Sequence, residues 1–308
     1  MSVIAAVKRW VIILRAPFFQ ATYIPVALGA ALAWSLFGVF DLFLLALTLA
    51  AAILLDGANH MLNDYWDFKS GTDLAVAHSN PFAGGGRALT MGLIDLSFHF
   101  RVALALLVIG VAAGLTLVAL RGPFILILGV IGVFSLFFYV GPPVKLAHRG
   151  IGEIFVALNY GPLMVLGSYF VQTQRLDFQP IVASLPLALL IAAVLWINEF
   201  PDFEVDKTTR KFTLVVRLGL ARSYKVLSTI LILPYVVIIL AVATGIAPPL
   251  TLVGLIGLPL ALKALKHLSK TYENPNAMTP ANAFVVLSHL ITGIGLIAAF
   301  VGQGLIFA

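Results

Sequence analysis

The chain has 308 residues, of which 61% are hydrophobic and only 10% are charged. Soluble domains carry roughly 45–50% apolar and about 25% charged residues, so a water-soluble fold is excluded and a protein embedded in lipid is expected. The absence of cysteine excludes disulfides, thiolate metal sites and cysteine nucleophiles. The net charge of +6 arises from 19 Lys and Arg residues scattered between apolar blocks, which favours a membrane protein over a nucleic-acid-binding one.

Nine apolar blocks are each long enough to cross a bilayer as a helix, which takes about 20 apolar residues. Because the blocks are continuously apolar rather than alternating, they predict helices and not the strands of a barrel. The predicted spans are 12–37, 41–62, 98–120, 123–142, 151–171, 181–200, 224–244, 247–265 and 283–305. We therefore expect one all-α integral membrane domain over residues 1–308.

The positions of Lys and Arg predict how this domain is oriented. If the N-terminus is cytoplasmic, only Arg121 and Arg175 fall on the opposite side of the membrane. The other 17 positive residues lie in cytoplasmic segments or at the helix ends beside them: Lys8, Arg9, Arg15, Lys69, Arg87, Arg101, Lys145, Arg149, Lys207, Arg210, Lys211, Arg217, Arg222, Lys225, Lys263, Lys266 and Lys270. This asymmetry follows the positive-inside rule and predicts a cytoplasmic N-terminus with the C-terminus on the other side.

Two matched sets of Asn and Asp follow the second and sixth predicted spans. The first set is Asn59, Asn63 and Asp67, and the second set is Asn198, Asp202 and Asp206. Within each set the residues are four apart, which places them on one face of a helix. We expect the two faces to meet in a central cavity of the bundle that opens toward the cytoplasmic side.

The residue types in these sets indicate a particular chemistry. Carboxylate and amide oxygens are hard donors that suit Mg²⁺, which keeps waters and binds through substrate phosphates. Clustered carboxylates repel one another unless cations neutralise them. Helix capping explains any single residue here, but it does not explain two sets with the same spacing. The sets therefore predict a site where a diphosphate is bridged by Mg²⁺ ions.

One more carboxylate, Asp56, lies deeper in the second predicted span. An ionisable residue inside a membrane span is a functional candidate by default. However, Asp56 lies off the helical face that carries Asn59, so a structural polar pair explains it at least as well. Both interpretations stay open at this point.

The chain resembles the UbiA superfamily of intramembrane prenyltransferases over nearly its whole length. The resemblance is carried by Asn63-Asp64-x-x-Asp67 with a later Asp, and by Asp202-x-x-x-Asp206. Segments 63–73, 150–172 and 213–219 are most similar to the menaquinone branch, the 1,4-dihydroxy-2-naphthoate prenyltransferases. Much of the superfamily has an aspartate four residues after Asp67, where this chain has Gly71. The next carboxylate is Asp73, as in the menaquinone-type branch.

The resemblance implies Mg²⁺-dependent transfer of a prenyl chain from an allylic prenyl diphosphate to an aromatic acceptor, such as 1,4-dihydroxy-2-naphthoate. The prenyl tail would lie in a channel that opens to membrane lipid. The expected metal ligands are Asn63, Asp67, Asp73, Asp202 and Asp206. The expected catalytic residues are Asp64, Asp67, Asp202 and Asp206, with Asp64 as the candidate base. The expected diphosphate-binding residues are Arg87, Lys145, Tyr139, Lys69, Arg15, Asn59 and Asn198.

Two of these basic candidates rest on further resemblance. Arg87 begins the stretch 87–92, which is similar to the family's Arg-Pro-Leu-x-x-Gly, and Tyr139 with Lys145 resembles the family's Tyr…Lys pair that contacts the diphosphate. Positive-inside topology alone would also place a Lys or Arg at each of these positions.

Three other functions remain open. Archaeal-lipid synthases of this superfamily alkylate a glycerol-phosphate hydroxyl instead of an aromatic ring. An ion-coupled transporter would also carry membrane carboxylates, although its site usually lies near the bilayer midplane and not at the helix ends. A purely structural membrane scaffold is the third alternative, and the two matched acidic sets argue against it.

Overall fold

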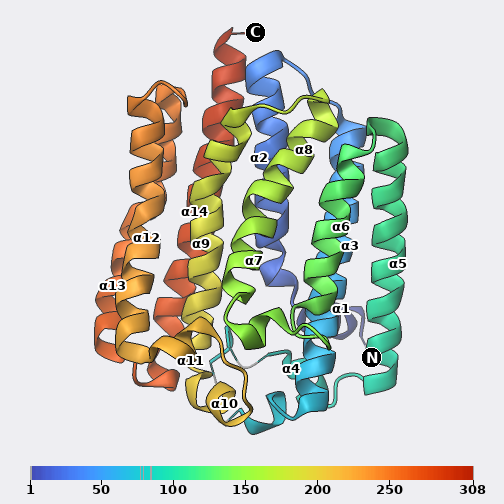
Figure 1. The fold of residues 1–308 in the computed structure, drawn as a ribbon, viewed down its shortest axis with the longest axis vertical. Coiled ribbons are helices and arrows are strands. Elements are labelled where there is room, and N and C mark those ends of the chain that lie inside the picture. The colour runs from blue at the N-terminus through green and yellow to red at the C-terminus, as the bar shows by residue number, and fades with distance from the viewer. Residues whose placement is uncertain (1, 77, 79, 84, 308) are drawn as a thin grey trace.

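The computed structural model describes residues 2–76, 78, 80–83 and 85–307, and the described residues form helices and loops without a β-strand. The long helices lie side by side with their axes nearly parallel (Figure 1). The helices are α1 (Val3–Ile13), α2 (Gln20–Phe37), α3 (Leu42–Ser70), α4 (Arg87–Thr90), α5 (Leu96–Arg121), α6 (Phe124–Phe138), α7 (Gly152–Leu158), α8 (Met164–Thr173), α9 (Phe178–Glu199), α10 (Phe203–Thr208), α11 (Leu214–Leu218), α12 (Leu220–Ala243), α13 (Leu258–Thr271) and α14 (Thr279–Phe307). Short 3₁₀ or π turns are η1 (Ala16–Phe19), η2 (Asp73–Ala75), η3 (Leu146–Arg149), η4 (Asn159–Leu163), η5 (Pro249–Gly257) and η6 (Pro275–Ala277).

Eight helical segments among the described residues are long and apolar enough to cross a membrane, which makes the chain a multi-pass integral membrane protein. These segments are Ala16–Phe37, Leu42–Ser70, Leu96–Arg121, Gly152–Thr173, Phe178–Glu199, Leu220–Ala243, Pro249–Thr271 and Thr279–Ile306. The remaining predicted span, 123–142, corresponds to α6, which has only 15 residues. A ninth crossing therefore stays a prediction.

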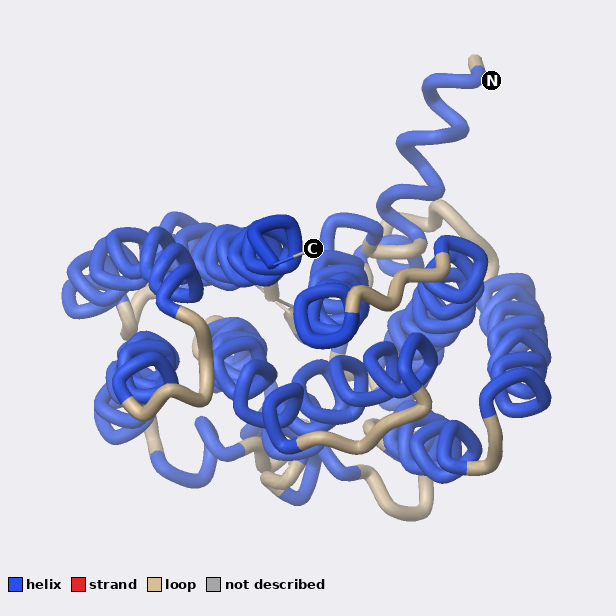
Figure 2. The backbone as a smooth tube through the Cα atoms, turned by 90° about the horizontal axis from the view of Figure 1, so that it is seen from above, coloured by secondary structure: helices blue, strands red, loops and turns tan. Residues whose placement is uncertain are grey.

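The first predicted span differs from the structure at its beginning. Residues 12 and 13 belong to α1, a separate helix that extends sideways from the bundle (Figure 2). Arg15 adopts a left-handed backbone conformation with a φ of 52°, and Pro17 follows within η1. Both features interrupt the helix, because left-handed residues do not continue it and a proline disfavours the helical conformation of the residue before it.

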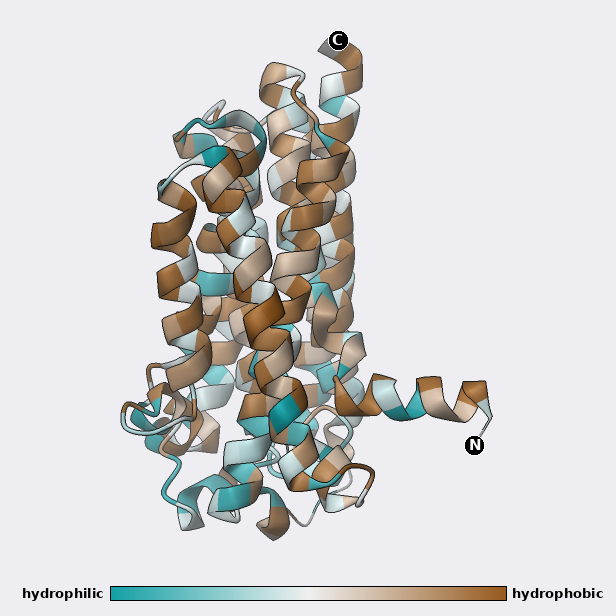
Figure 3. Cartoon of the chain, turned by 90° about the vertical axis from the view of Figure 1, so that its right-hand side faces the viewer, coloured by the Kyte–Doolittle hydropathy of each residue, from teal (hydrophilic) through white to brown (hydrophobic). Residues whose placement is uncertain are grey.

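The packing of the bundle is that of a protein in lipid. Its largest buried cluster joins α2, α9, α12, α13 and α14 and includes Leu28, Leu187 and Leu231, all fully buried. The outward surface is apolar as well: Val108 on α5 and Val130 on α6 are 65% and 60% exposed. Apolar colouring covers the spans in Figure 3, and hydrophilic residues gather at the end of the bundle where α1 lies. That end also carries α4 and α10, whereas the C-terminus lies at the other end (Figure 1).

Candidate active site

The first acidic set lies on the last turns of α3. This helix continues to Ser70, beyond the predicted end of the second span, and Gly71 terminates it with a φ of 86°. Asn63 and Asp67 are therefore held on a continuous helix, as their four-residue spacing predicts.

The second acidic set does not lie on one continuous helix, contrary to our expectation. Helix α9 ends at Glu199, Pro201 lies in the turn that follows, and α10 begins at Phe203. A proline removes a backbone N–H and clashes with the preceding turn, which explains the break. Asp202 is the N-cap residue of α10, and Asp206 lies within α10.

The two sets nevertheless face one cavity of about 100 Å³ at the end of the bundle where α10 lies. The expected site residues that line it are Arg15, Asn63, Asp67, Asp73, Tyr139, Asn198, Asp202 and Asp206. We call this space the acidic cavity. It brings together residues separated by more than 130 positions in the chain, so their juxtaposition is a product of the bundle and not of local sequence.

Lys211 is the residue that the sequence reasoning missed. It lines the acidic cavity and links the two sets, because its Nζ lies 3.0 Å from Oδ2 of Asp67 and 3.9 Å from Oδ1 of Asp206. Its side chain is only 17% exposed. In the sequence it is one of several loop lysines, five residues after Asp206, and no periodic spacing distinguishes it from Lys207.

Burial and charge in the acidic cavity shift the titration of these groups. Burial, followed by repulsion from Asp67 and Asp64, raises the pKa of Asp73 to about 9. Burial also raises the pKa of Asp206 to about 7, although Lys211 opposes this shift. Burial alone would lower the pKa of Lys211, but the nearby carboxylates raise it well above its usual value, so this lysine stays charged.

Several oxygen atoms at the cavity match the donors that Mg²⁺ prefers. The side-chain oxygens Oδ1 of Asn63 and Oδ2 of Asp73 are buried, and no described residue forms a hydrogen bond with them. Within the described part of the chain, no three His, Asp or Glu side chains are close enough together to form a compact metal site. The donors line a space and do not converge on a point, which fits a cation that is ligated jointly by protein, water and diphosphate.

The loop segment with Gly85 and Gly86 packs closely against the carboxyl groups of Asp73 and Asp64. A Cβ added to Gly86 would lie 1.7 Å from Oδ2 of Asp64, and one added to Gly85 would lie 2.1 Å from Oδ1 of Asp73. Only glycine permits the backbone to approach these side chains so closely. Asp64 itself points to Arg15, whose guanidinium lies 3.4 Å from its Oδ1, and it does not line the cavity.

Polar side chains from other elements hold the second set in place. Asn282 on α14 donates from its Nδ2 to Oδ1 of Asn198 at 2.8 Å and accepts from Asn80 at 3.0 Å. His78 lies 2.7 Å from Oδ1 of Asp202. Asn80 and Asn282 are fully buried. This network connects the loop after α3 with α9 and α14, which positions the two acidic sets relative to each other.

Four expected diphosphate-binding residues lie outside the acidic cavity. Arg87 donates to the main-chain oxygen of Asn80 at 2.6 Å, so it braces the loop. Lys69 and Lys145 line a neighbouring pocket of about 200 Å³. Asn59 lies in the wall of a third, apolar cavity, one helical turn away from Asn63. Their roles at the diphosphate remain predictions.

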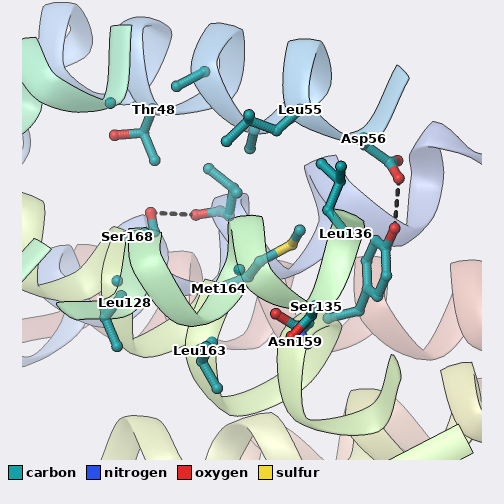
Figure 4. A pocket seen from close by; sticks show the side chains of 18 of the residues that line it. Thr48, Leu55, Asp56, Leu128, Ser135, Leu136, Asn159, Leu163, Met164 and Ser168 are labelled. Atoms are coloured by element: carbon teal, nitrogen blue, oxygen red, sulfur yellow. Dashed lines mark hydrogen bonds between the residues drawn. The ribbon is translucent and has the colours of Figure 1, made fainter. Parts of the chain in front are cut away.

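The apolar cavity has a volume of about 210 Å³ and lies between α3, α5, α6 and the α7–α8 segment. Leu55, Leu128, Leu136, Leu163 and Met164 are among the apolar residues of its wall (Figure 4). Tyr139 lines both this cavity and the acidic cavity. An apolar space therefore adjoins an acidic one, which is the arrangement needed by a molecule with a hydrocarbon tail and an anionic head.

Comparison with known proteins agrees with this arrangement. The model for the UbiA prenyltransferase family matches residues 22–301. The 2-carboxy-1,4-naphthoquinone phytyltransferase of Synechocystis sp. is 27% identical over 305 residues, which are 97% of this chain and 94% of that protein. The 1,4-dihydroxy-2-naphthoate octaprenyltransferase of Bacillus subtilis is 29% identical over 246 residues, 80% and 77% of the two chains. A solved structure of a UbiA homologue from Archaeoglobus fulgidus bound to GPP and Mg²⁺ has a TM-score of 0.65 at 17% identity, covering 94% of this chain and 99% of that one.

Proposed function

The chain belongs to the UbiA prenyltransferase family, and on this premise we propose that it transfers a prenyl chain from an allylic prenyl diphosphate to 1,4-dihydroxy-2-naphthoate or a closely related quinone precursor. The observation that carries the proposal is the pairing of an acidic cavity with an apolar one across Tyr139. The acceptor is inferred from relatives that are named for naphthoate or naphthoquinone substrates. We further propose that residues 1–308 act as one domain.

The acidic cavity is the proposed site of the diphosphate and of Mg²⁺. The residues that would hold the metal are Asn63, Asp67, Asp73, Asp202 and Asp206, and the unpartnered oxygens of Asn63 and Asp73 support this role. Bound Mg²⁺ would supply Lewis-acid stabilisation of the departing diphosphate. The Mg²⁺ in the Archaeoglobus fulgidus homologue supports the choice of metal.

Lys211 and Arg15 are the proposed cationic partners of the diphosphate. Both line the acidic cavity, and each now pairs with a carboxylate of α3, Asp67 or Asp64. Cationic groups held in place before the reaction stabilise charge that develops as the allylic C–O bond breaks. Lys69 and Lys145 are kept as candidates for guiding the diphosphate toward the cavity, because they lie in the adjacent pocket.

The prenyl tail would occupy the apolar cavity. The surface of its wall is mainly apolar, so the tail would be held away from water. Exclusion of water matters because water would capture an allylic cation before it alkylates the acceptor ring. The bond that forms joins C1 of the prenyl chain to a ring carbon, and the diphosphate leaves with the electron pair of the broken C–O bond. The ring carbon gives up its former substituent, as a proton or as CO₂, and the electron pair of that bond restores the aromatic ring.

The orientation in the membrane follows from the charges. We propose that the end with the acidic cavity faces the cytoplasm and that the C-terminus lies on the other side. Arg121 and Arg175 lie near each other at the end of the bundle opposite the acidic cavity. There Gln174 donates to the main-chain oxygen of Arg121 at 3.4 Å. These are the two positive residues that the positive-inside rule assigns to the non-cytoplasmic side.

The decisive test supplies purified protein with Mg²⁺, geranylgeranyl diphosphate and either 1,4-dihydroxy-2-naphthoate or glycerol phosphate. Product is followed by mass spectrometry. We expect a prenylated naphthalene and no glycerol ether. An ether product with unconverted naphthoate would contradict the proposed acceptor. Solute uptake into proteoliposomes without any prenyl transfer would contradict the enzyme altogether and favour a transporter.

The titration of the acidic cavity predicts that Mg²⁺ binds more tightly as the pH rises. Below a pKa of about 7 for Asp206 and about 9 for Asp73, these carboxyl groups hold protons in the metal-free protein. Mg²⁺ needs carboxylates, so binding must release protons. The affinity should increase by about tenfold per pH unit between pH 7 and 9, where Asp73 releases its proton, and more steeply below pH 7, where Asp206 releases one as well. Isothermal titration in buffers of different ionisation enthalpy measures this release directly. Asp206→Asn should remove only the additional steepness below pH 7, because Asp73 still releases its proton, and a wild-type affinity that does not vary with pH would refute the prediction.

A further inference from the structure

Three side chains form a polar cluster in the wall of the apolar cavity. The carboxyl group of Asp56 accepts hydrogen bonds from the hydroxyls of Thr22 at 2.6 Å and Tyr160 at 2.5 Å. The Nδ2 of Asn59 in turn donates to the Tyr160 hydroxyl at 3.3 Å. Asp56, Asn59 and Tyr160 all line the cavity, and Figure 4 shows the hydrogen-bonded carboxyl group of Asp56 at its edge. A carboxyl group only 3% exposed at membrane depth calls for a functional explanation.

Each hydrogen bond in this cluster has a fixed donor and acceptor: Asn59 donates to Tyr160, and Tyr160 donates to Asp56. The carboxyl group of Asp56 fixes this order. A carboxylate can only accept, so the single proton of the Tyr160 hydroxyl must point to Asp56. The Tyr160 oxygen can then only accept from Asn59, which commits the amide nitrogen of Asn59 to Tyr160. The carboxamide oxygen of Asn59 is left over, because only the amide nitrogen takes part in the cluster. The cluster therefore presents one oriented acceptor atom to the cavity.

The backbone around Tyr160 is held firmly in place. Tyr160 lies in the π turn η4, next to Gly161. A Cβ added to Gly161 would lie 2.4 Å from Cβ of Ala188, so η4 packs directly on α9 and turns Tyr160 toward α3. A single π turn within an α-helical segment is frequently found at functional sites.

Other polar residues in the cavity wall differ from this cluster. Thr48, Ser135 and Asn159 each donate to a main-chain oxygen four residues earlier in their own helix. The hydroxyls of Thr48 and Ser135 are satisfied in this way and need no ligand, and Asn159 bonds to its own helical segment and not to a side chain on another element. The Asp56–Tyr160–Asn59 cluster instead joins α3 to η4 and leaves an acceptor atom facing the cavity.

We infer that this cluster recognises a hydroxyl group of the aromatic acceptor, which donates to the carboxamide oxygen of Asn59. The inference rests on the proposed function. A prenyl tail has no hydrogen-bonding group, and the diphosphate is assigned to the acidic cavity, so the acceptor is the substrate that can use this atom. Asn59 precedes Asn63 by four residues, about 6 Å along α3, which places the acceptor beside the reacting end of the prenyl chain. Asp56 acts as a positioning residue through Tyr160.

The test compares Tyr160→Phe and Asp56→Asn with the wild type in steady-state kinetics. Both variants release Asn59 from its orientation, and an asparagine at position 56 can also reverse the hydrogen bonds. Loss of one oriented hydrogen bond should raise the KM for 1,4-dihydroxy-2-naphthoate roughly three- to tenfold. The KM for the prenyl diphosphate should not change. Binding of the naphthoate alone, measured by isothermal titration, should weaken by the same factor and does not depend on turnover.

Two matched controls separate recognition from structure. Thr116→Ala and Thr229→Ala each remove a hydroxyl that bonds to a main-chain oxygen of its own helix, at positions that do not line the cavity. Neither should alter the KM for the acceptor. The thermal midpoint of every variant in detergent reports whether the fold is retained.

An acceptor analogue that lacks one hydroxyl group completes the test. The wild type should prefer the dihydroxy compound by the same three- to tenfold factor, and Tyr160→Phe should lose this preference. The inference is overturned if the variants keep the preference, if they raise the KM of both substrates equally, or if only their thermal midpoints change. The two claims can fail separately. If the wild type prenylates no aromatic compound, the proposed function is wrong. If Tyr160→Phe still weakens binding of the naphthoate in that case, the recognition site is nevertheless supported.

Discussion

Replacing Asp67 with asparagine should reduce prenyl transfer on the order of 10²- to 10³-fold, because Asp67 is both a proposed Mg²⁺ ligand and the ion-pair partner of Lys211. It lines the acidic cavity and the neighbouring pocket of Lys69 and Lys145, and it forms the ion pair with Lys211. The amide keeps the size of the side chain but loses its charge, so Lys211 would lack its nearest counter-ion and Mg²⁺ one ligand. Initial rates of product formation at saturating Mg²⁺ measure the loss.

The matched control for this variant is Asp95→Asn. Asp95 caps the first turn of α5 at an exposed position, where it accepts from the main-chain N–H groups of Ser97 and Phe98. An asparagine can cap a helix almost as well as an aspartate, so both stability and turnover should be retained. If Asp67→Asn kept full activity while binding Mg²⁺ normally, the assignment of the acidic cavity as the reaction site would be wrong.

Replacing Lys211 with methionine should change the binding of metal and of substrate in opposite directions. The methionine removes a positive charge beside Asp67 and Asp206, so Mg²⁺ should bind more tightly to the substrate-free protein. The prenyl diphosphate should bind at least about tenfold more weakly, because a charge-assisted hydrogen bond to its phosphate is lost. Calorimetric titrations with Mg²⁺ alone and with an unreactive prenyl thiodiphosphate measure the two effects separately.

The thermal stability of the Lys211→Met variant should also depend on Mg²⁺. Breaking a buried ion pair costs about 3–5 kcal/mol, and the partial exposure of Lys211 places the effect at the lower end of this range. The thermal midpoint in detergent should therefore fall in EDTA and recover in Mg²⁺. Lys207→Met serves as the control, because Lys207 is exposed in the same segment and lies over the ring of Phe203. A midpoint for Lys211→Met that does not respond to Mg²⁺ would show that Lys211 and the metal do not share these carboxylates.

The amino-acid sequence by itself determined the membrane fold and the two halves of the site. Long apolar blocks have to form helices in lipid, because each backbone group must be bonded within its own segment. For this reason the predicted spans agree with eight long helical segments. The four-residue spacing of Asn63 and Asp67 was also sufficient to place both on one face of α3, since that spacing is a property of the helix itself.

Local patterns failed where the chain bends. Arg15 and Pro17 separate α1 from the first span, and Pro201 separates α9 from α10, so two segments that read as continuous helices are divided. Asp202 and Asp206 still face the acidic cavity, although the geometry that brings them there is a turn and not a helical face. The four-residue spacing therefore predicted that Asp202 and Asp206 face one space, but it did not predict the turn that places them there.

Only the tertiary structure decided which residues complete each cavity. Lys211 meets Asp67 across 144 positions of the chain, and Tyr160 meets Asp56 across 104. The sequence also predicts Arg87 and Asn59 beside the diphosphate. The structure shows Arg87 bonded to a loop and Asn59 in the wall of the apolar cavity, and their roles at the diphosphate stay predictions. The spacing of residues along a helix specifies the face on which each side chain lies. Which other helix that face contacts depends on how helices distant in the sequence pack together, and local spacing does not encode this packing.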